Sequence, residues 1–466
     1  MNKFRLIGVL ICLTGCTLIP DYQRPGLPVS SVWPGPPSNI QSEVVADIGW
    51  REFFADERLQ KLLELALANN RDLRIAALNV EQIRAQYRIF TYAFFPSLDG
   101  KTTVLRQREV SSSGQYTTSS KYSVGLNTSY EMDLFGRIRS LKAQALEQYF
   151  ATDEARRSAQ IVLVSEVAIQ YLNERALNEE LVLSQETLKS VQAYYELIKS
   201  SYDLGHRSAL DLHSAEAQVQ TAQANIAAYE RQHAQAENAL VFLIGQSLPA
   251  DLPPPQPLAT QRLLKDLTPG LPSDLLERRP DILQAEHELK AANANIGAAR
   301  AAFFPEITLT AAGGSASAEL SKLLTPGSEV WNFSPQITIP IFNQNTNAAQ
   351  LDVARIGKSI AVARYEKVIQ NAFREVSNAL VATGTLQDQV KAQKALVEAL
   401  TQRYKLADER YRNGADSYLT VLTAQQDLYA AQQNFIQVEF TRLANLVSFY
   451  NALGGGWQES TPSKSQ

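Results

Sequence analysis

Residues 122–132 read YSVGLNTSYEM and alternate between two kinds of side chain. Tyr, Val, Leu, Thr and Met hold the even positions and mostly small polar residues hold the odd ones, which is typical of a β-strand with one apolar and one polar face. Residues 331–341, WNFSPQITIPI, show the same alternation. Pro335 interrupts it, and because proline cannot donate to a sheet ladder we expect a rim or a bulge there.

These two stretches belong to a longer internal repeat. Phe94-Phe95-Pro96 returns as Phe303-Phe304-Pro305, an offset of 305 − 96 = 209 residues. The same offset relates Gly205 to Gly414. Solenoid repeats recur every ~20 to 50 residues, so this period is too long for one. We therefore interpret the chain as a duplicated half-molecule.

Each half contains the same order of elements. A helix ends at Phe-Phe-Pro, where proline stops it, two alternating strands follow, and two long helices flank a glycine turn. The expected helices are Arg58–Tyr92, Arg137–Ser201 and Ser208–Ile244 in the first half and Ser273–Ala302, Asn345–Tyr411 and Ser417–Leu453 in the second. At about 1.5 Å per residue the longest would reach roughly 100 Å, which predicts antiparallel helical rods and not a compact globule.

The predicted organisation follows from this order, and a Pro-rich linker separates the two repeats. It comprises a signal peptide at 1–15, a lipidated extended segment at 16–57, a first repeat at 58–248 with strands at about 97–132, the linker at 249–272, a second repeat at 273–457 with strands at about 306–342, and a tail at 458–466.

The N-terminus has the layout of an export signal. Two basic residues precede the apolar run Leu6–Leu13, which is too short to span a bilayer as a helix. Leu13-Thr14-Gly15-Cys16 resembles the lipobox at which bacterial lipoproteins are cleaved, so we expect acyl chains on Cys16 and no other cofactor. Thr17 replaces the Asp that retains lipoproteins at the inner membrane, which indicates the outer membrane. The alternative is an ordinary signal peptide with a chance cysteine.

Composition excludes several classes of protein. The formal charge is −4 over 466 residues with acids and bases interspersed, so there is no basic face for nucleic acid. Beyond the signal no apolar run approaches the ~18 residues of a transmembrane helix, so a membrane crossing requires strands. One chain supplies about four strands, and the smallest closed membrane barrels have about eight. An open sheet would leave unpaired edges in lipid, so the chain has to oligomerise as a dimer, a trimer or a tetramer.

Several motifs make the mature chain similar to one known family along essentially its whole length. They are residues 16–22, CTLIPDY; 70–74, NRDLR; 131–137, EMDLFGR; 279–282, RPDI; 294–305, ANIGAARAAFFP; and 452–457, ALGGGW. The chain resembles the outer-membrane factors of resistance-nodulation-division efflux systems, the NodT-like efflux lipoproteins. This resemblance implies an α+β membrane protein whose homotrimer forms a 12-stranded β-barrel and a 12-helix periplasmic tunnel, which selects the trimer.

The resemblance also implies partners, namely a periplasmic adaptor protein, an inner-membrane efflux pump and outer-membrane lipid. Residues 21–25, 49–51 and 339–343 look most like the copper- and silver-efflux branch of the family. The sequence has only two methionines, Met1 and Met132, so the soft ligand clusters expected for Cu(I) are absent. If copper is the cargo, other subunits must capture it.

Catalytic signatures are missing, so we expect no enzyme activity. The sequence has no His-Glu-x-x-His, Gly-x-Ser-x-Gly or Gly-x-Gly-x-x-Gly. Gly357-Lys358-Ser359 imitates the end of a phosphate loop but lies inside a long predicted helix. His206, Asp211 and His213 suggest a metal site near a turn, yet the two histidines would lie about 10 Å apart along a helix. We expect a solvated tip without metal.

The two glycine turns are the candidate functional tips. In the family, the turns farthest from the barrel close the tunnel like an iris, held by polar or charged residues next to each turn. By position the candidate gate residues are Asp211, Tyr411, Arg412, Asp416, Thr420 and Thr423, and the candidate adaptor contacts are Leu204, Gly205, Asn413 and Gly414. Thr420 and Thr423 stand where family members often carry carboxylates, which departs from the family pattern. We expect Asp211 to bind a neighbouring tip base, with Arg412 the preferred candidate.

These features favour one function, the outer-membrane exit duct of a tripartite efflux pump that passes metal cations or drugs from periplasm to exterior. A type I secretion duct for polypeptides would have the same fold. A non-conducting structural or adhesion lipoprotein is the other alternative, but helical rods alone have no use for alternating strands.

Overall fold

The computed structural model describes residues 17–30, 32–33, 45–110, 112, 114–261, 263 and 272–461. The signal peptide and the proposed lipidation site Cys16 lie outside the described residues. The chain divides into two compact units, each assembled from three stretches of sequence. The first unit contains residues 1–26, 79–153 and 284–366, and the second contains residues 27–78, 154–283 and 367–466.

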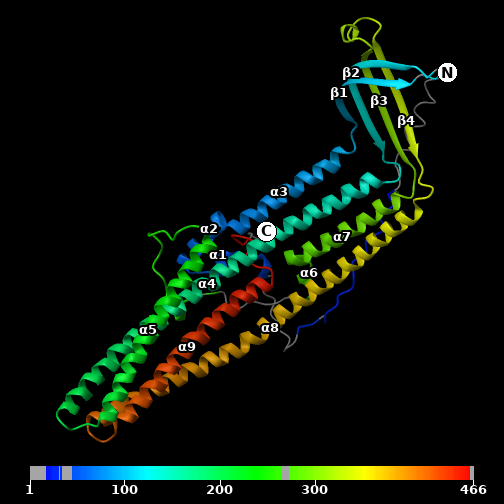
Figure 1. Ribbon diagram of the computed structural model, residues 1–466. Coiled ribbons are helices and arrows are strands. Elements are labelled where there is room, and N and C mark those ends of the chain that lie inside the picture. The colour runs from blue at the N-terminus through cyan, green and yellow to red at the C-terminus, as the bar shows by residue number, and fades with distance from the viewer. Residues whose placement is uncertain are drawn as a thin grey trace. The chain divides into compact units, whose positions relative to one another are not determined.

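The first unit contains an antiparallel sheet to which each repeat contributes two strands. Its strands are β1, Ser97–Val110; β2, Tyr116–Met132; β3, Glu306–Ser317; and β4, Glu329–Thr338. They lie side by side in the order β1-β2-β3-β4 (Figure 1). The central pair, β2 with β3, joins the two repeats. Strands β1 and β4 are the edges, and each leaves one side of its backbone unpaired in the described chain.

The register gives the sheet two chemically different faces, because directly opposite residues of an antiparallel ladder lie on the same face. One face carries Leu98, Val104, Val124, Leu126, Tyr130, Leu309, Phe333 and Ile337, and the other carries Asp99, Lys101, Thr103, Lys121, Ser123, Asn127, Asn332, Ser334 and Gln336. The alternation seen in the sequence is therefore confirmed as an apolar and a polar face.

Pro335 corrects one expectation about this sheet. It stands opposite Leu309 in an unbroken register, so the predicted rim or bulge is wrong. The proline fits the sheet of a single chain because β4 is its last strand, so a missing amide donor need not cost a bond within that sheet. The second strand pair also ends at Thr338, so Ile339 and Ile341 lie beyond β4.

Residues 17–24 form an N-terminal strap along the first unit. Asn293 Nδ2 donates to the carbonyl of Pro20 at 2.7 Å, and Arg300 Nη1 donates to the carbonyl of Leu18 at 3.1 Å. Asn293 contacts Pro20, and Arg300, later in its helix, contacts Leu18, earlier in the strap. The strap therefore runs antiparallel to the helix that contains Asn293 and Arg300.

Glu286 is the charged anchor of the strap. Arg24 donates to its two carboxylate oxygens at 3.0 and 2.8 Å, Tyr22 donates at 3.1 Å, and Lys290 lies 3.4 Å away. Burial acts to raise the pKa of the Glu286 carboxyl, but the bonds and charges of these partners outweigh it and lower the pKa. The carboxylate therefore stays charged while almost fully buried.

The helices are long where the sequence predicts long helices. They are α1, Trp50–Phe53; α2, Glu57–Asn69; α3, Arg71–Tyr92; α4, Arg137–Asp203; α5, Ala209–Ile244; α6, Leu275–Arg278; α7, Pro280–Ala301; α8, Gln344–Arg412; and α9, Tyr418–Ala452. The expected bounds of α4, α5, α8 and α9 are right to within two residues. Within the described ranges no helix combines the length and the apolarity needed to cross a membrane.

The first helix of each repeat is broken, so the continuous helices predicted at Arg58–Tyr92 and Ser273–Ala302 are wrong. Asn70 is extended, with ψ at 133°, and its side-chain oxygen accepts from the amide of Leu73 at 2.9 Å to cap α3. Arg279 is extended in the same way because it precedes Pro280, whose ring disfavours the helical conformation of the residue before it. Each break starts a new helix.

The segment predicted to be extended before residue 58 contributes to the core of the second unit. Trp50, Phe53 and Phe54 are almost completely buried around the short helix α1. The Phe53 ring stacks on Tyr450 with the centroids 4.0 Å apart. The amide of Trp50 donates to the carbonyl of Gln458 at 3.0 Å, which ties this segment to the C-terminal tail. The expectation of an extended segment is therefore wrong for Trp50–Phe53, which is helical, whereas Phe54 is extended.

Candidate functional site at the helix tips

The two long hairpins of the second unit turn in the same way. The turns between α4 and α5 and between α8 and α9 lie side by side (Figure 1). Gly205 and Gly414 adopt positive φ, 79° and 73°, which other residues adopt only with strain. In both turns the amide after the glycine donates at 2.8 Å to the carbonyl five residues earlier, the bond of a Schellman motif. The glycines are therefore required by backbone geometry.

Asp211 has a local partner at the start of α5. The amide of Asp211 donates to Ser208 Oγ at 3.1 Å, and Ser208 Oγ donates to Asp211 Oδ2 at 2.9 Å. This reciprocal capping places a carboxylate at the positive end of a helix dipole. At the equivalent start of α9, Ser417 Oγ lies 3.4 Å from Thr420 Oγ1, and no side chain caps the backbone. The start of α5 therefore has a side-chain cap that the start of α9 lacks.

Three tyrosines form the centre of the tip core. Tyr194, Tyr411 and Tyr418 lie in a triangle with ring centroids 6.0 to 6.3 Å apart, and all three are buried. The Arg207 guanidinium lies 5.0 Å from the Tyr411 ring. Burial, followed by the neighbouring Tyr411, raises the pKa of Tyr418 to about 12. The candidate gate residue Tyr411 therefore packs between the two hairpins of its own chain.

Asp408 organises the charged groups beside this core. It accepts hydrogen bonds from Tyr194 Oη and, at 2.9 Å, from Arg412 Nε. Burial, and then the bond to Asp408, raises the pKa of the Tyr194 hydroxyl. Arg410 binds Asp416 across the second turn at 2.6 Å. Arg412 is thus bound on its own helix, and the structure does not bring it to Asp211 within one chain.

Three leucines are exposed on the otherwise polar outer surface of the tips. Leu204, Leu210 and Leu419 are 73%, 76% and 66% exposed. Sequence reasoning named Leu204 but missed the other two. The signal was available, because each of the missed leucines follows a helix-starting serine by two residues, at equivalent places of the repeat. Thr420 and Thr423 are exposed beside them, and Thr423 Oγ1 donates to the carbonyl of Leu419 at 2.9 Å.

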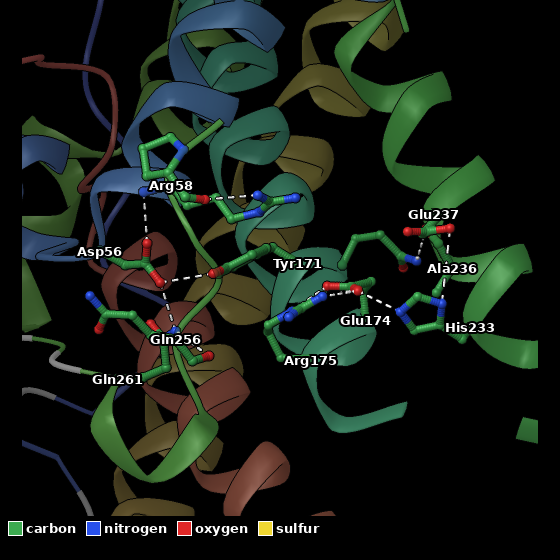
Figure 2. A network of polar contacts seen from close by, with 12 residues as sticks. Asp56, Arg58, Tyr171, Glu174, Arg175, His233, Ala236, Glu237, Gln256 and Gln261 are labelled. Carbon is green, nitrogen blue, oxygen red and sulfur yellow. Dashed lines mark hydrogen bonds and ion pairs between the residues drawn. The ribbon is translucent and has the colours of Figure 1, made fainter. Parts of the chain in front are cut away.

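A polar network in the second unit was also missed by the sequence (Figure 2). The buried carboxylate of Asp56 accepts from Tyr171 Oη at 2.8 Å and from Gln261 Nε2 at 2.7 Å. It also caps α2 by accepting from the amides of Arg58 and Leu59 at 2.8 and 3.2 Å. This one side chain therefore joins α2, α4 and the described part of the linker.

His233 lies in the neighbouring part of this network. Its Nε2 is 2.7 Å from Glu174 Oε1 and its Nδ1 is 3.9 Å from Glu237 Oε2 (Figure 2). Such donors suit a divalent cation, and their ligand atoms lie within 4.8 Å of one another. Arg175, however, already binds both oxygens of Glu174. The arrangement therefore acts best as a hydrogen-bonded network in which Glu174 of α4 contacts His233 of α5.

Comparison with known proteins places this geometry among membrane channels. The chain matches the family model described as outer membrane efflux protein over residues 62–246 and 271–455. The solvent efflux pump outer membrane protein SrpC of Pseudomonas putida is 49% identical over 468 residues, which cover 98% of this chain and 99% of that protein.

Solved structures agree with this similarity. The open state of the outer membrane channel MtrE of Neisseria gonorrhoeae superposes with a TM-score of 0.89 at 41% identity, covering 96% of this chain and all 100% of that one. CusC, solved in work on its folding and transmembrane channel formation, gives a TM-score of 0.85 at 40% identity, with 95% and 100% covered.

Proposed function

The chain belongs to the outer membrane efflux protein family and is the outer-membrane component of an efflux pump, and we propose that three copies close one exit duct. In this proposal the sheets join edge to edge into a barrel, and the helical hairpins form the wall of a periplasmic tunnel. Small solutes leave the periplasm through it.

The observation that carries this proposal is the pair of unpaired sheet edges. Strands β1 and β4 have 14 and 10 residues, and each has backbone groups without a partner on its outer side in the described chain. In lipid each such group costs several kcal/mol, so an open sheet of this length is unstable there. Pairing β4 of one copy with β1 of the next removes both edges. The family resemblance selects three copies.

The tips support a contact with a periplasmic adaptor protein, which in turn would connect the duct to an inner-membrane pump. The exposed leucines at 204, 210 and 419 form apolar contact points on an otherwise polar surface. Gly205, Asn413 and Gly414 shape the turns between them. Acyl chains on Cys16 would add an anchor in outer-membrane lipid.

We retain the gate at the tips as part of this proposal. Asp211 and Asp416 are partly exposed, and Arg412, Thr420 and Thr423 are exposed, so all five remain able to meet a neighbouring copy. Within one chain, however, Asp408 competes for Arg412. A lock between Asp211 and Arg412 of different copies must therefore exchange one ion pair for another, and its net strength is about 1 kcal/mol or less per pair.

The cargo class follows from the relatives. The name of SrpC supports organic solvents as cargo. The copper- and silver-efflux branch suggested by residues 21–25, 49–51 and 339–343 stays a prediction. The absence of methionine clusters from the sequence speaks against Cu(I) binding by this chain itself.

The duct is tested by native mass spectrometry and planar-bilayer recording of the purified protein. We expect a trimeric mass and discrete channels. Monomers without conductance would contradict the proposal.

The gate is tested by the conductance of Asp211→Ala, Arg412→Ala and the double variant, with Asp408→Asn as the control that frees Arg412 from its own helix. A shared lock predicts a larger conductance in both single variants with no further gain in the double. Unchanged conductance in all three removes Asp211 from the gate.

A further inference from the structure

The polar face of the sheet contains a hollow where glycines of β2 and β3 face each other. Gly125 and Gly314 stand directly opposite each other in this pair. A Cβ on Gly314 would lie 2.2 Å from the carbonyl oxygen of Val124, and a Cβ on Gly125 would lie 2.6 Å from that of Gly313. Because side chains cannot fill this place, a hollow of about 330 Å³ remains on the sheet surface.

Two lysines border this hollow. Lys101 of β1 lies opposite Gly125. Lys121 of β2 is two residues before Ser123, so both side chains lie on the same face of the sheet, and both residues line the hollow. Within the described residues neither lysine has an ion-pair or hydrogen-bond partner. Asn127 and Asn332 supply amide groups on the same wall. The hollow thus combines two free cations with neutral hydrogen-bonding groups.

Acidic residues on this face lie outside the hollow. Asp99 and Glu109 are on β1 at either side of it, and neither lines it. Glu109 accepts from Gln107 at 2.6 Å, and Glu131 near the other end of the sheet is bound by Arg137. The positive charge is therefore local to the middle of the sheet, between two zones that contain acids.

We propose that this hollow is an anion site on the water-facing wall of the duct, which binds solutes through a carboxylate, sulfonate or phosphate group. The inference rests on the proposed trimeric duct, in which every copy would place Lys101 and Lys121 around one shared passage. Rings of Lys or Arg side chains favour anions in pores of this kind. An amphipathic acid leaving the cell would be held at the lysines by its charged end.

The test is the ion selectivity of the reconstituted wild-type protein and of a Lys101→Gln, Lys121→Gln double variant. The reversal potential is measured across a planar bilayer with a potassium chloride gradient near 0.1 M. We expect the chloride-to-potassium permeability ratio to fall by at least about twofold in the double variant. The difference should shrink toward 1 M salt, where the screening length falls from about 10 Å to about 3 Å.

Arg106→Gln is the matched control, since Arg106 belongs to the same strand but shares the face of Val104 and Tyr122. It should leave the permeability ratio unchanged, and Lys101→Arg with Lys121→Arg should keep the wild-type value. A shift in Arg106→Gln as large as that of the double variant would overturn the assignment of faces.

The two proposals fail in different ways. Wild-type trimers that conduct no current would contradict the duct. Conducting channels whose selectivity is the same in the wild type and in the double glutamine variant would contradict the anion site alone. Inorganic phosphate added to one chamber gives a second measurement, because it should reduce the chloride current of the wild type and not that of the double variant.

Discussion

Asn70 and Arg279, separated by 279 − 70 = 209 residues, make the same hydrogen bond in the two repeats. Asn70 Nδ2 donates to the carbonyl of Leu243 at 2.8 Å, and Arg279 Nη1 donates to the carbonyl of Ala452 at 2.9 Å. The two carbonyls are themselves 209 residues apart, at the C-terminal ends of α5 and α9. The break in the first helix of each repeat therefore holds the end of the last helix of that repeat.

Replacement of these two residues should have unequal effects. Arg279 also binds Asp281 at 2.6 Å and Glu375 at 2.9 Å, so Arg279→Ala leaves two carboxylates without their partner. We expect a loss of about 2 to 3 kcal/mol, below the value for a fully buried pair because both acids are partly exposed. Asn70→Ala should cost about 1 kcal/mol. Thermal melting of both variants in detergent measures the difference, and equal losses would contradict a special role for the ion pairs.

The two faces of β2 should respond oppositely to a charge. Leu126→Arg should cost about 2 to 4 kcal/mol near the bilayer midplane because its face meets lipid, whereas Asn127→Arg should be tolerated. Urea titration of folding into lipid vesicles compares these adjacent positions. Ile339→Arg should be milder than Leu126→Arg, since Ile339 lies beyond the end of β4. Equal damage at 126 and 127 would show that the faces are not divided between lipid and water.

Lipidation should anchor the chain without being needed to form the channel. A Cys16→Ser protein should still be found as a trimer in outer-membrane extracts, because the closed sheet has its own apolar band. Mass spectrometry of the wild-type N-terminus should show acyl chains on Cys16 that the variant lacks. A variant that stays in the periplasm as a soluble monomer would contradict this expectation.

The tip core should weaken in alkali. The pKa of Tyr418 is raised from the ordinary 10.0 to about 12, so the folded state keeps the phenolic proton more tightly than the unfolded state. The corresponding stability is complete below pH 10 and is lost as the pH rises from 10 to about 12, a loss of about 2 to 3 kcal/mol. Melting temperatures of wild type and Tyr418→Phe between pH 8 and 11.5 test this. The difference in melting temperature between the two proteins should change above pH 10. A difference that stays constant over the whole pH range would contradict the prediction.

The long helices could be predicted because their information is local. Ala, Leu, Gln and Glu favour helix, and glycines at 205 and 414 end it. The break before Pro280 also had a local signal, the restriction that proline places on the residue before it. The break at Asn70 had only a weak local signal, the pair Asn69-Asn70, because asparagine suits a helix cap better than a helix interior. It is stabilised by contacts to Leu243, which a reading of neighbouring residues cannot supply.

The sequence predicted where the candidate site lies in the chain, but it did not predict which of its residues contact each other. The glycine turns marked the tips, yet the bond between Tyr194 and Asp408 joins residues 214 apart, and no spacing rule connects them. The burial of Tyr411 has the same origin, because it depends on the packing of α4 against α8 and α9. Asp56 was missed for this reason too, since its partners Tyr171 and Gln261 are 115 and 205 residues away.

The N-terminal strap imposes an order on folding. Its bonds reach residues 262 to 282 positions later in the chain, on α7 of the second repeat. Contacts of such high sequence separation have to close a very long loop and therefore form late. The strap therefore reaches its final place only after α7 of the second repeat has formed. Until then Glu286 lacks its arginine partner, so docking of the strap completes the first unit.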